Sequence, residues 1–353
     1  MKQNLLFVAK GMPNKIKSGG DFRAYNMLKI LKNEYDLFVI ANSADYGQSD
    51  VKGIGCESYL AGDIFSTVKE LFRIKNFEIV ILSGWAIAQQ LFDFIRELSS
   101  STKIVVDTID VEFLRNKRES EFKKIENPEF EILKRQELQV YRKADLVITT
   151  STQDKEELLK HYDFNYRITK IIELPCLFEV NNSYQSTSGK NAYTIANWTH
   201  RPNVEATIFL CQEIIPKTDL NFYIVGKHPP DAIRNFASNK ITICGAEYEI
   251  ERFLTKMNLL LAPVFYSAGM NSKIGQGLAF GIPTVTTTMG AEPYGLIHEE
   301  SVMIGDNVET FLDSINKIIK DEELRKKLSL NGRSVMENYT IQKWKDSFLQ
   351  EIK

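Results

Sequence analysis

The sequence is poor in the features that mark secreted and nucleic-acid-binding proteins. Its 353 residues include only 4 cysteines, and no two of them form a C-x-x-C pair. We therefore expect reduced thiols, mostly buried, in a cytoplasmic protein. The formal net charge at pH 7 is only −2, so a basic surface for nucleic acid is not expected. The cysteines are Cys56, Cys176, Cys211 and Cys244.

Long apolar runs are missing as well. The N-terminal segment has only five consecutive apolar side chains, Leu5–Ala9, which is too few for the apolar region of a signal peptide. No stretch approaches the roughly 20 apolar residues of a membrane-spanning helix. The chain is therefore expected in the cytoplasm. Peripheral contact with the inner face of the membrane, through an amphipathic surface, stays open as an alternative.

Several motifs of catalysis and cofactor binding are also absent. No G-x-G-x-x-G follows the first apolar run and no G-x-x-x-x-G-K-[ST] occurs, so neither a dinucleotide dehydrogenase nor a P-loop protein is favoured. No G-x-S-x-G is present for a serine hydrolase. The histidines lack zinc-site spacing, and no Asp-x-Asp triplet could hold a metal against a diphosphate. We therefore expect no bound metal.

What the sequence contains is a regular alternation of short apolar runs with segments of helical periodicity. Continuous runs rich in Val and Ile are typical of strands in a parallel sheet that helices cover on both faces. The segments between them fit crossover helices. The runs are Leu5–Ala9, Leu37–Ala41, Phe77–Leu82, Ile104–Asp107, Leu146–Thr150, Ile168–Leu174, Ala192–Ala196, Phe222–Val225, Ile241–Cys244, Leu259–Val264, Thr284–Thr287 and Val302–Ile304.

A polar interval, Asn181–Asn191, divides these runs into two equal sets and has almost nothing to bury, so it is the predicted linker. The predicted fold class is α/β, with two Rossmann-like domains at residues 1–180 and 190–338 that face each other across a cleft. Ligands of such sheets bind beyond the carboxyl ends of the strands. Residues from about 339 to 353 predict one more helix.

The densest chemical signal lies in residues Ala262–Thr287. A loop containing Gly269 follows a strand there, a helix begins near Asn271, and Gly281 ends that helix. A glycine loop that leads into a helix presents free backbone N–H groups, which suit a phosphate. Lys273 lies in the first turn, where it opposes the helix dipole and is unfavourable unless an anion lies nearby. The alternative is a surface lysine on an ordinary crossover helix.

At this point the sequence resembles a known family. The pattern Gly-x-x-x-Lys-Ile-Gly-Gln-x-Leu-Ala-x-Gly-Ile-Pro-x-Val-Thr-Thr of residues 269–287 is similar to the donor-binding motif of glycosyltransferase family 4, which has the GT-B fold. Weaker similarity extends over most of the chain. It includes Ser18–Arg23, Val106–Arg115, Asn197–Ala206, Tyr223–Gly226 and Ile243–Gly245.

The resemblance implies a retaining, metal-independent glycosyltransferase with a nucleotide-diphosphate sugar as co-substrate. The nucleotide would bind mainly to the second domain, and a glycan or lipid-linked acceptor would enter from the first. The transfer would proceed by front-face attack, without a protein nucleophile. Stabilising the charge that develops on the leaving diphosphate should then be the main catalytic contribution. The family's common role is the biosynthesis of surface polysaccharides and glycoconjugates. The final helix would cross back onto the first domain.

Lys273 and Arg201 are the cations predicted to stabilise the diphosphate, and both are assigned catalytic roles. The backbone of Gly269, Met270 and Asn271 is predicted to bind the donor beside them. In the first domain, the glycine pair Gly19 and Gly20 would let the backbone approach the diphosphate; its alternative is a plain strand-to-helix turn.

Asp110, at the end of an apolar run, is the third catalytic candidate and would orient the transferred sugar or the acceptor hydroxyl. Its alternative is an N-cap for the next helix. Tyr248 could stack on the base of the donor, and Glu292 could reach the donor. Arg23 is expected to be a solvated helix residue more readily than a functional one. Glu112, Arg115 and Glu119 are expected to form surface ion pairs.

The sequence departs from the family pattern in two places. The family often carries Glu-x7-Glu, and this chain has Ala268 and Gln276 at the matching positions. Gln276 can still form hydrogen bonds with ribose hydroxyls, but without charge. The family's Arg and Lys for the diphosphate are replaced by Asn197 and Asn203 in an approximate alignment. The loss of Glu-x7-Glu fits one alternative, a non-catalytic scaffold of the same fold. A second alternative is another GT-B-like enzyme, such as a sugar-nucleotide epimerase.

Overall fold

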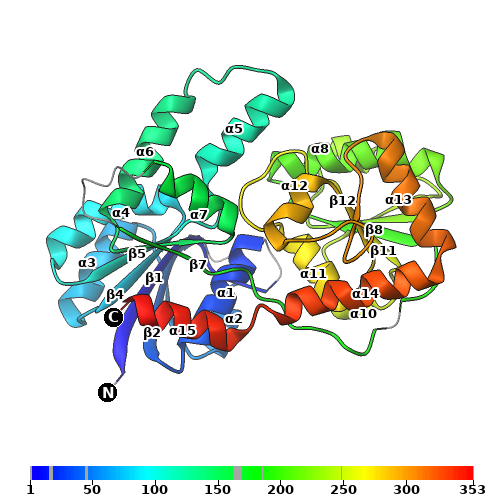
Figure 1. Ribbon diagram of the computed structural model, residues 1–353. Helices are drawn as coiled ribbons and strands as arrows, with labels where there is room; N and C mark the ends of the chain where they lie inside the picture. Colours follow the sequence, from blue (N-terminus) through cyan, green and yellow to red (C-terminus); the bar gives the residue numbers. More distant parts are fainter. Residues whose placement is uncertain are drawn as a thin grey trace. The chain divides into compact units, whose positions relative to one another are not determined.

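The computed structural model describes residues 2–15, 19–43, 47–161, 169–184, 186–247 and 249–352. The chain divides into two compact units, one made of Met1–Pro175 with Ile341–Lys353 and the other of Cys176–Thr340. Each unit is built around a parallel sheet with helices packed against it (Figure 1). The predicted fold class, two Rossmann-like α/β units, is confirmed.

The sheet of the first unit has seven parallel strands in the order β3-β2-β1-β4-β5-β6-β7. Its predicted strands are all present. The sequence missed β3, an edge strand of four residues in which no side chain is buried, so no apolar run marks it. The strands are β1 (Gln3–Gly11), β2 (Tyr35–Ser43), β3 (Glu57–Leu60), β4 (Ile79–Ser83), β5 (Lys103–Asp107), β6 (Leu146–Thr149) and β7 (Lys170–Glu173).

Helices cover both faces of this sheet. The order of strands reverses beside β1, so right-handed crossovers place α1 and α2 on one face and α3 and α4 on the other. The pair α5 and α6 extends beyond the remaining helices of the unit (Figure 1). The helices are α1 (Gly19–Leu31), α2 (Gly47–Gly53), α3 (Ile64–Ile74), α4 (Trp85–Leu98), α5 (Glu112–Lys123), α6 (Phe130–Lys143), α7 (Thr152–Leu159) and α15 (Ile341–Ile352).

The last helix, α15, packs on the first unit against α1. Its Trp344 and Phe348 are buried and stack with ring centroids 5.7 Å apart. Lys345 forms an ion pair with Glu34 at 3.1 Å. Apolar burial and this ion pair together hold the C-terminal segment on a sheet that begins more than 300 residues earlier in the chain.

The sheet of the second unit has six parallel strands in the order β10-β9-β8-β11-β12-β13. Apolar side chains pack on both of its faces in two separate clusters. The strands are β8 (Asn191–Ile195), β9 (Asn221–Val225), β10 (Ile241–Gly245), β11 (Leu259–Ala262), β12 (Thr284–Thr286) and β13 (Met303–Ile304). The helices are α8 (Arg201–Phe209), α9 (Asp231–Arg234), α10 (Ile250–Leu254), α11 (Ser272–Phe280), α12 (Thr288–Ala291), α13 (Val308–Lys320) and α14 (Glu322–Glu337).

The polar interval before β8 packs on the second unit. Arg333 donates hydrogen bonds to the backbone oxygens of Asn181 and Tyr184 at 3.1 and 3.3 Å. Tyr184 itself is buried, and its hydroxyl donates to the oxygen of Met257 at 2.7 Å. The expectation that this interval buries almost nothing is therefore wrong at Tyr184, because one aromatic side chain anchors the segment to the core.

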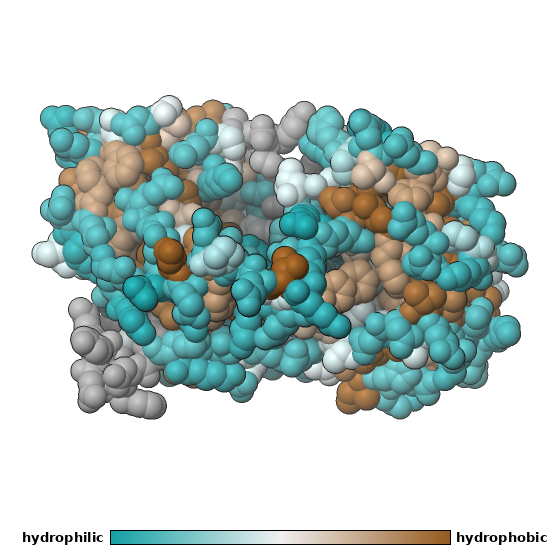
Figure 2. All heavy atoms as spheres, turned by 90° about the horizontal axis from the view of Figure 1, so that it is seen from above, coloured by the Kyte–Doolittle hydropathy of each residue, from teal (hydrophilic) through white to brown (hydrophobic). Residues whose placement is uncertain are grey.

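Figure 2 shows one face of the molecule, coloured by hydropathy. On the face shown in Figure 2, hydrophilic side chains predominate and apolar ones occur in small separate groups. Within the described ranges, no helix combines the length and the apolar character needed to cross a membrane.

Candidate functional site

The strand order of the second sheet reverses between β8 and β11. In open α/β sheets, two neighbouring strands flank such a reversal, and the chain continues from them in opposite directions. A crevice therefore forms between the two connections at the carboxyl edge of the sheet. Here those connections lead into α8 and α11. The crevice is therefore the first place in this unit to search for a ligand site.

The start of α11 presents free backbone donors. Gly269 has a φ of 67°, a left-handed conformation that glycine adopts without steric cost. Asn271 is the N-cap residue, and its side chain forms no capping hydrogen bond. Among the described residues, the N–H groups of Ser272 and Lys273 have no acceptor. These two donors and the helix dipole make this end of α11 suitable for an anion.

Tyr294 fixes this first turn, and sequence reasoning missed it. Its buried hydroxyl accepts the N–H of Gly275 at 3.2 Å and donates to the oxygen of Asn271 at 2.9 Å. A Cβ added at Gly275 would lie 2.4 Å from the ring of Phe178 and 2.7 Å from that hydroxyl. The absence of a side chain at Gly275 therefore allows Tyr294 and Phe178 to pack against this turn of α11. Nothing in the local sequence signals it, because Tyr294 is 19 residues further along the chain.

Lys273 is a buried cation with a neutral partner. Its side chain is 8% exposed, and Nζ donates to Oδ1 of Asn203 at 2.9 Å. No carboxylate of the described residues forms an ion pair with it. Burial lowers the pKa of Lys273 to about 8. The alternative of a surface lysine is wrong, because α11 turns this side chain across the crevice toward α8. A buried cation without a counter-ion favours an arriving anion.

Asn203 connects the two sides of the crevice. Besides accepting from Lys273, it donates from Nδ2 to the backbone oxygen of Asn197 at 3.0 Å. Sequence comparison had marked Asn203 as a position where the family's cation is lost. In the structure, this side chain instead fixes the cation of Lys273, which comes from the neighbouring helix.

Arg201 begins α8 and is exposed. It forms an ion pair with Glu205 at 2.8 Å, and its side chain is 70% exposed. Glu205 also accepts from the buried hydroxyl of Tyr266 at 2.7 Å. Arg201 and Asn203 both lie in the first turn of α8. The charge of Arg201 is already paired with Glu205, so Arg201 is a weaker candidate than Lys273 for binding a diphosphate.

The remaining donor-binding candidates differ in exposure. Gln276 is half-buried one turn after Lys273, and within residues 186–247 and 249–352 its amide has no hydrogen-bonding partner. Met270 is buried in the apolar cluster, so its side chain packs while its backbone remains in the glycine loop. Glu292 is exposed at the start of a short 3-10 turn. Tyr248 lies outside the described residues.

The first unit has its own reversal of strand order, between β1 and β4. Gly19 and Gly20 are there the first two residues of α1, so they belong to a helix N-terminus and not to a separate turn. Arg23, in the next turn, is 3% exposed and pairs with Asp107 at 2.8 Å. It also donates to the oxygen of Leu174 at 2.7 Å. The expectation of a solvated Arg23 is wrong, because this residue ties α1 to the ends of two strands.

Asp110 follows β5 and is half-buried. It forms an ion pair with Arg115, which also lies 3.2 Å from Glu112. The preceding Ile109 has a φ of 63°, which is strained for a β-branched residue. The N-cap of α5 is Val111, so the alternative role of Asp110 as an N-cap is wrong. The expected ion pairs are present, because Arg115 pairs with Glu112 at 3.2 Å and Glu119 pairs with Lys123 at 2.6 Å, although these side chains are partly buried.

A buried carboxylate from α6 caps α5 instead. Glu137 is 1% exposed and accepts the N–H groups of Glu112 and Phe113 at 2.8 and 2.7 Å. It also accepts from the hydroxyl of Tyr141 at 2.7 Å. Burial raises the pKa of Glu137 to about 7 despite these donors. The residue fixes the start of the helix that carries Arg115, and sequence reasoning missed it.

This cap predicts a pH-dependent stability. The pKa of Glu137 is about 7 in the folded state and 4.5 as a reference value for the unfolded state. Between pH 4.5 and 7 the folded state therefore binds more protons than the unfolded state. The free energy of unfolding should therefore fall as pH rises from about 4.5 to 7, by about 3 kcal/mol. Urea unfolding of Glu137→Gln across this range should show a flatter dependence. Exposed Glu131→Gln on the same helix should keep the wild-type slope; equal slopes in both variants would refute the assignment.

Comparison with known proteins places these features in context. Residues 190–321 match the family model described as Glycosyl transferases group 1. This range includes α8, α11 and the crevice between them. No curated protein sequence matches the chain significantly.

Solved structures match over the whole chain. Sucrose-phosphate synthase from Thermosynechococcus elongatus superposes with a TM-score of 0.76 at 13% identity, covering 99% of this chain and 98% of that one. Anabaena HepE in complex with UDP and glucose gives 0.74 at 12% identity, covering 99% and 98%. A Staphylococcus aureus TarM variant in complex with fondaparinux, alpha-GlcNAc-glycerol and UDP gives 0.74 at 10%, covering all of both chains. Such identities establish the fold, which is the GT-B fold of glycosyltransferases.

Proposed function

We propose that the chain is a retaining glycosyltransferase that moves a sugar from a nucleotide-diphosphate donor to a glycan or glycolipid acceptor. Its expected setting is the biosynthesis of surface polysaccharides or glycoconjugates, in the cytoplasm or at the inner face of the membrane, and it would need no bound metal. The observation that carries this proposal is the buried cation of Lys273 at the N-terminus of α11, which has a neutral hydrogen-bond partner and, among the described residues, no ion-pair partner. The family match over this segment and the UDP complexes of HepE and TarM support it.

The α11 end can act on the leaving group of such a transfer. Cleavage of the bond between sugar and diphosphate concentrates negative charge on the diphosphate. The N–H groups of Ser272 and Lys273 together with the Lys273 ammonium are pre-oriented donors for that charge. Gln276, one turn further, offers an unpaired amide to ribose hydroxyls.

Asp110 is proposed to act on the sugar or the acceptor from the first unit. Its carboxylate pairs with Arg115 on one side. An ionised carboxylate only accepts hydrogen bonds, so Asp110 can orient a hydroxyl. The buried pair of Arg23 and Asp107 would keep α1, with Gly19 and Gly20 at its start, in a fixed position on the sheet.

A thermal-unfolding panel with UDP, GDP, dTDP, ADP, CMP and NAD tests donor binding. A ligand present at 100 times its dissociation constant should add about 2.7 kcal/mol to the free energy of unfolding. We expect stabilisation by one nucleoside diphosphate and none by NAD. That result would also identify the base of the donor. No stabilisation by any diphosphate would argue against a transferase.

A non-catalytic scaffold of the same fold is the second candidate. The observation that favours it is the uncharged pair Ala268 and Gln276, where the resembled family often has two glutamates. Substrate turnover separates the two functions. With the nucleotide identified by the panel, a transferase moves the sugar of the corresponding nucleotide sugar to an acceptor hydroxyl or to water and releases the nucleoside diphosphate, whereas a scaffold does not.

A further inference from the structure

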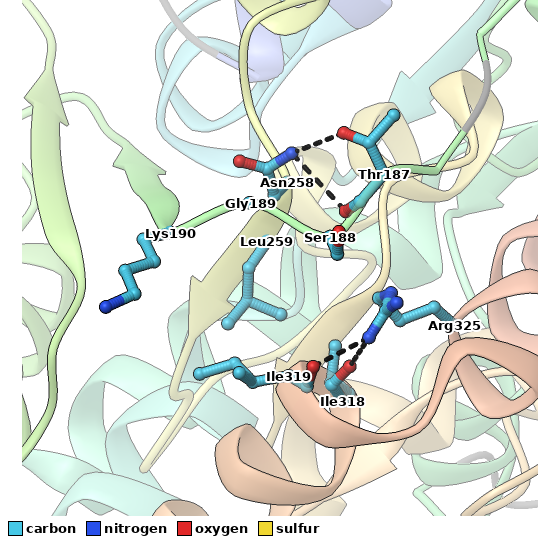
Figure 3. Close-up of a pocket in the computed structure, with 9 residues that line it drawn as sticks. All are labelled: Thr187, Ser188, Gly189, Lys190, Asn258, Leu259, Ile318, Ile319 and Arg325. Atoms are coloured by element: carbon cyan, nitrogen blue, oxygen red, sulfur yellow. Dashed lines mark hydrogen bonds between the residues drawn. The ribbon is translucent and has the colours of Figure 1, made fainter.

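A second ligand site is suggested at the opposite edge of the second sheet. A cavity of about 110 Å³ lies where β8 and β11 begin, and the donor crevice lies where these strands end. Its walls are the segment Thr187–Lys190, the start of β11, the end of α13 and one side chain of α14 (Figure 3). Nothing in the proposed transfer reaction uses this edge.

Arg325 is the unusual group in this cavity. It is 6% exposed, and Nη1 donates to the backbone oxygens of Ile318 and Ile319, both at 2.8 Å. Its Nε is buried without an acceptor. Nη2 likewise has no acceptor in the part of the chain that the structure describes, and no carboxylate there pairs with this guanidinium. Capping of α13 explains Nη1 only, so within the described residues the one N–H of Nε and the two of Nη2 have no acceptor in the protein.

The surrounding charge also favours an anion. Among the described residues that line the cavity, the charged ones are Arg325 and Lys190, and both are cations. In Figure 3 the guanidinium of Arg325 is directed toward the other lining residues, whereas the ammonium of Lys190 is directed away from them. The nearby carboxylate of Glu322 pairs with Lys326 at 2.8 Å. The Lys190 ammonium is only loosely associated with exposed Asp219, at 3.7 Å. A buried guanidinium with free donors is unfavourable unless an acceptor completes its hydrogen bonds.

We propose that this cavity binds a small oxyanion such as inorganic phosphate. Its volume of about 110 Å³ is well below the roughly 300–1,000 Å³ of pockets that hold larger ligands, so it suits a small tetrahedral anion but not a nucleotide. The anion would accept from the N–H groups of Nε and Nη2 of Arg325 and reach the hydroxyl of Ser188. It would thereby join the segment before β8 to α14 and stabilise the second unit.

Thermal unfolding of the full chain with inorganic phosphate tests this site, with sodium chloride at matched ionic strength as reference. At several times its dissociation constant, phosphate should raise the midpoint by about 2–4 °C in a saturable manner. Arg325→Met should abolish the rise. Ser188→Asp should abolish it too, because a built-in carboxylate would occupy the site. Ser188 is exposed, so this variant should fold even if Arg325→Met does not.

A Lys273→Ala background removes the contribution of the donor crevice to phosphate binding. In that background, the phosphate response should persist and should still depend on Arg325 and Ser188. An unchanged response in both variants, or no response in the parent chain, would overturn the proposal. A rise with glucose 1-phosphate but none with inorganic phosphate would overturn the assignment to a small free anion.

Discussion

Replacing Lys273 by alanine should weaken nucleoside-diphosphate binding about 10- to 100-fold, because charged hydrogen bonds contribute about 1.5–3 kcal/mol each. The ammonium is buried, and within the described parts of the chain it donates to the neutral side chain of Asn203 and to no carboxylate. An arriving diphosphate would supply the missing counter-charge. Calorimetric titration with the diphosphate identified by the nucleotide panel measures the loss.

The same substitution should leave the fold intact. Removing a buried cation relieves its desolvation, which offsets the lost hydrogen bond to Asn203. Lys273→Arg keeps the charge and should retain part of the affinity. Lys256→Ala, an exposed lysine of the same unit, should bind like the parent chain. Equal affinities of Lys273→Ala and Lys256→Ala would remove Lys273 from the proposed mechanism.

Asp107→Ala should destabilise the first unit by about 3–5 kcal/mol, since removing one partner of a buried ion pair leaves an uncompensated charge. Asp107 is fully buried and holds the guanidinium of Arg23, which is 3% exposed. Denaturant unfolding, followed by a probe in the first unit, measures the change.

Asp93→Ala is the matched control for this substitution. Asp93 pairs with Lys143 in the same unit at 2.8 Å, but the two side chains are 72% and 40% exposed. Exposed pairs contribute at most about 1 kcal/mol. Adding Arg23→Met to Asp107→Ala should recover part of the loss, because it removes the stranded charge. If Asp107→Ala is no more destabilising than Asp93→Ala, the pair does not hold α1 in place.

The strand pattern was predictable from the sequence because it depends on local chemistry. Strands such as β1, at Gln3–Gly11, are buried on both faces and must be continuously apolar. The start and end of α11 were equally predictable, since Asn271 occupies the N-cap position and Gly281, with a φ of 85°, ends the helix. Edge strand β3 escaped detection because it buries no side chain.

The sequence by itself thus determined two α/β units, a free helix end at Asn271 and a lysine in its first turn. Only the tertiary structure decided what surrounds that lysine. Asn203 lies 70 residues away from Lys273, and Glu137 lies 25 residues from the helix start that it caps. Arg23 reaches Asp107 across 84 residues. Short-range spacing encodes the elements, whereas burial and pairing of charged groups depend on which elements the sheet order brings together.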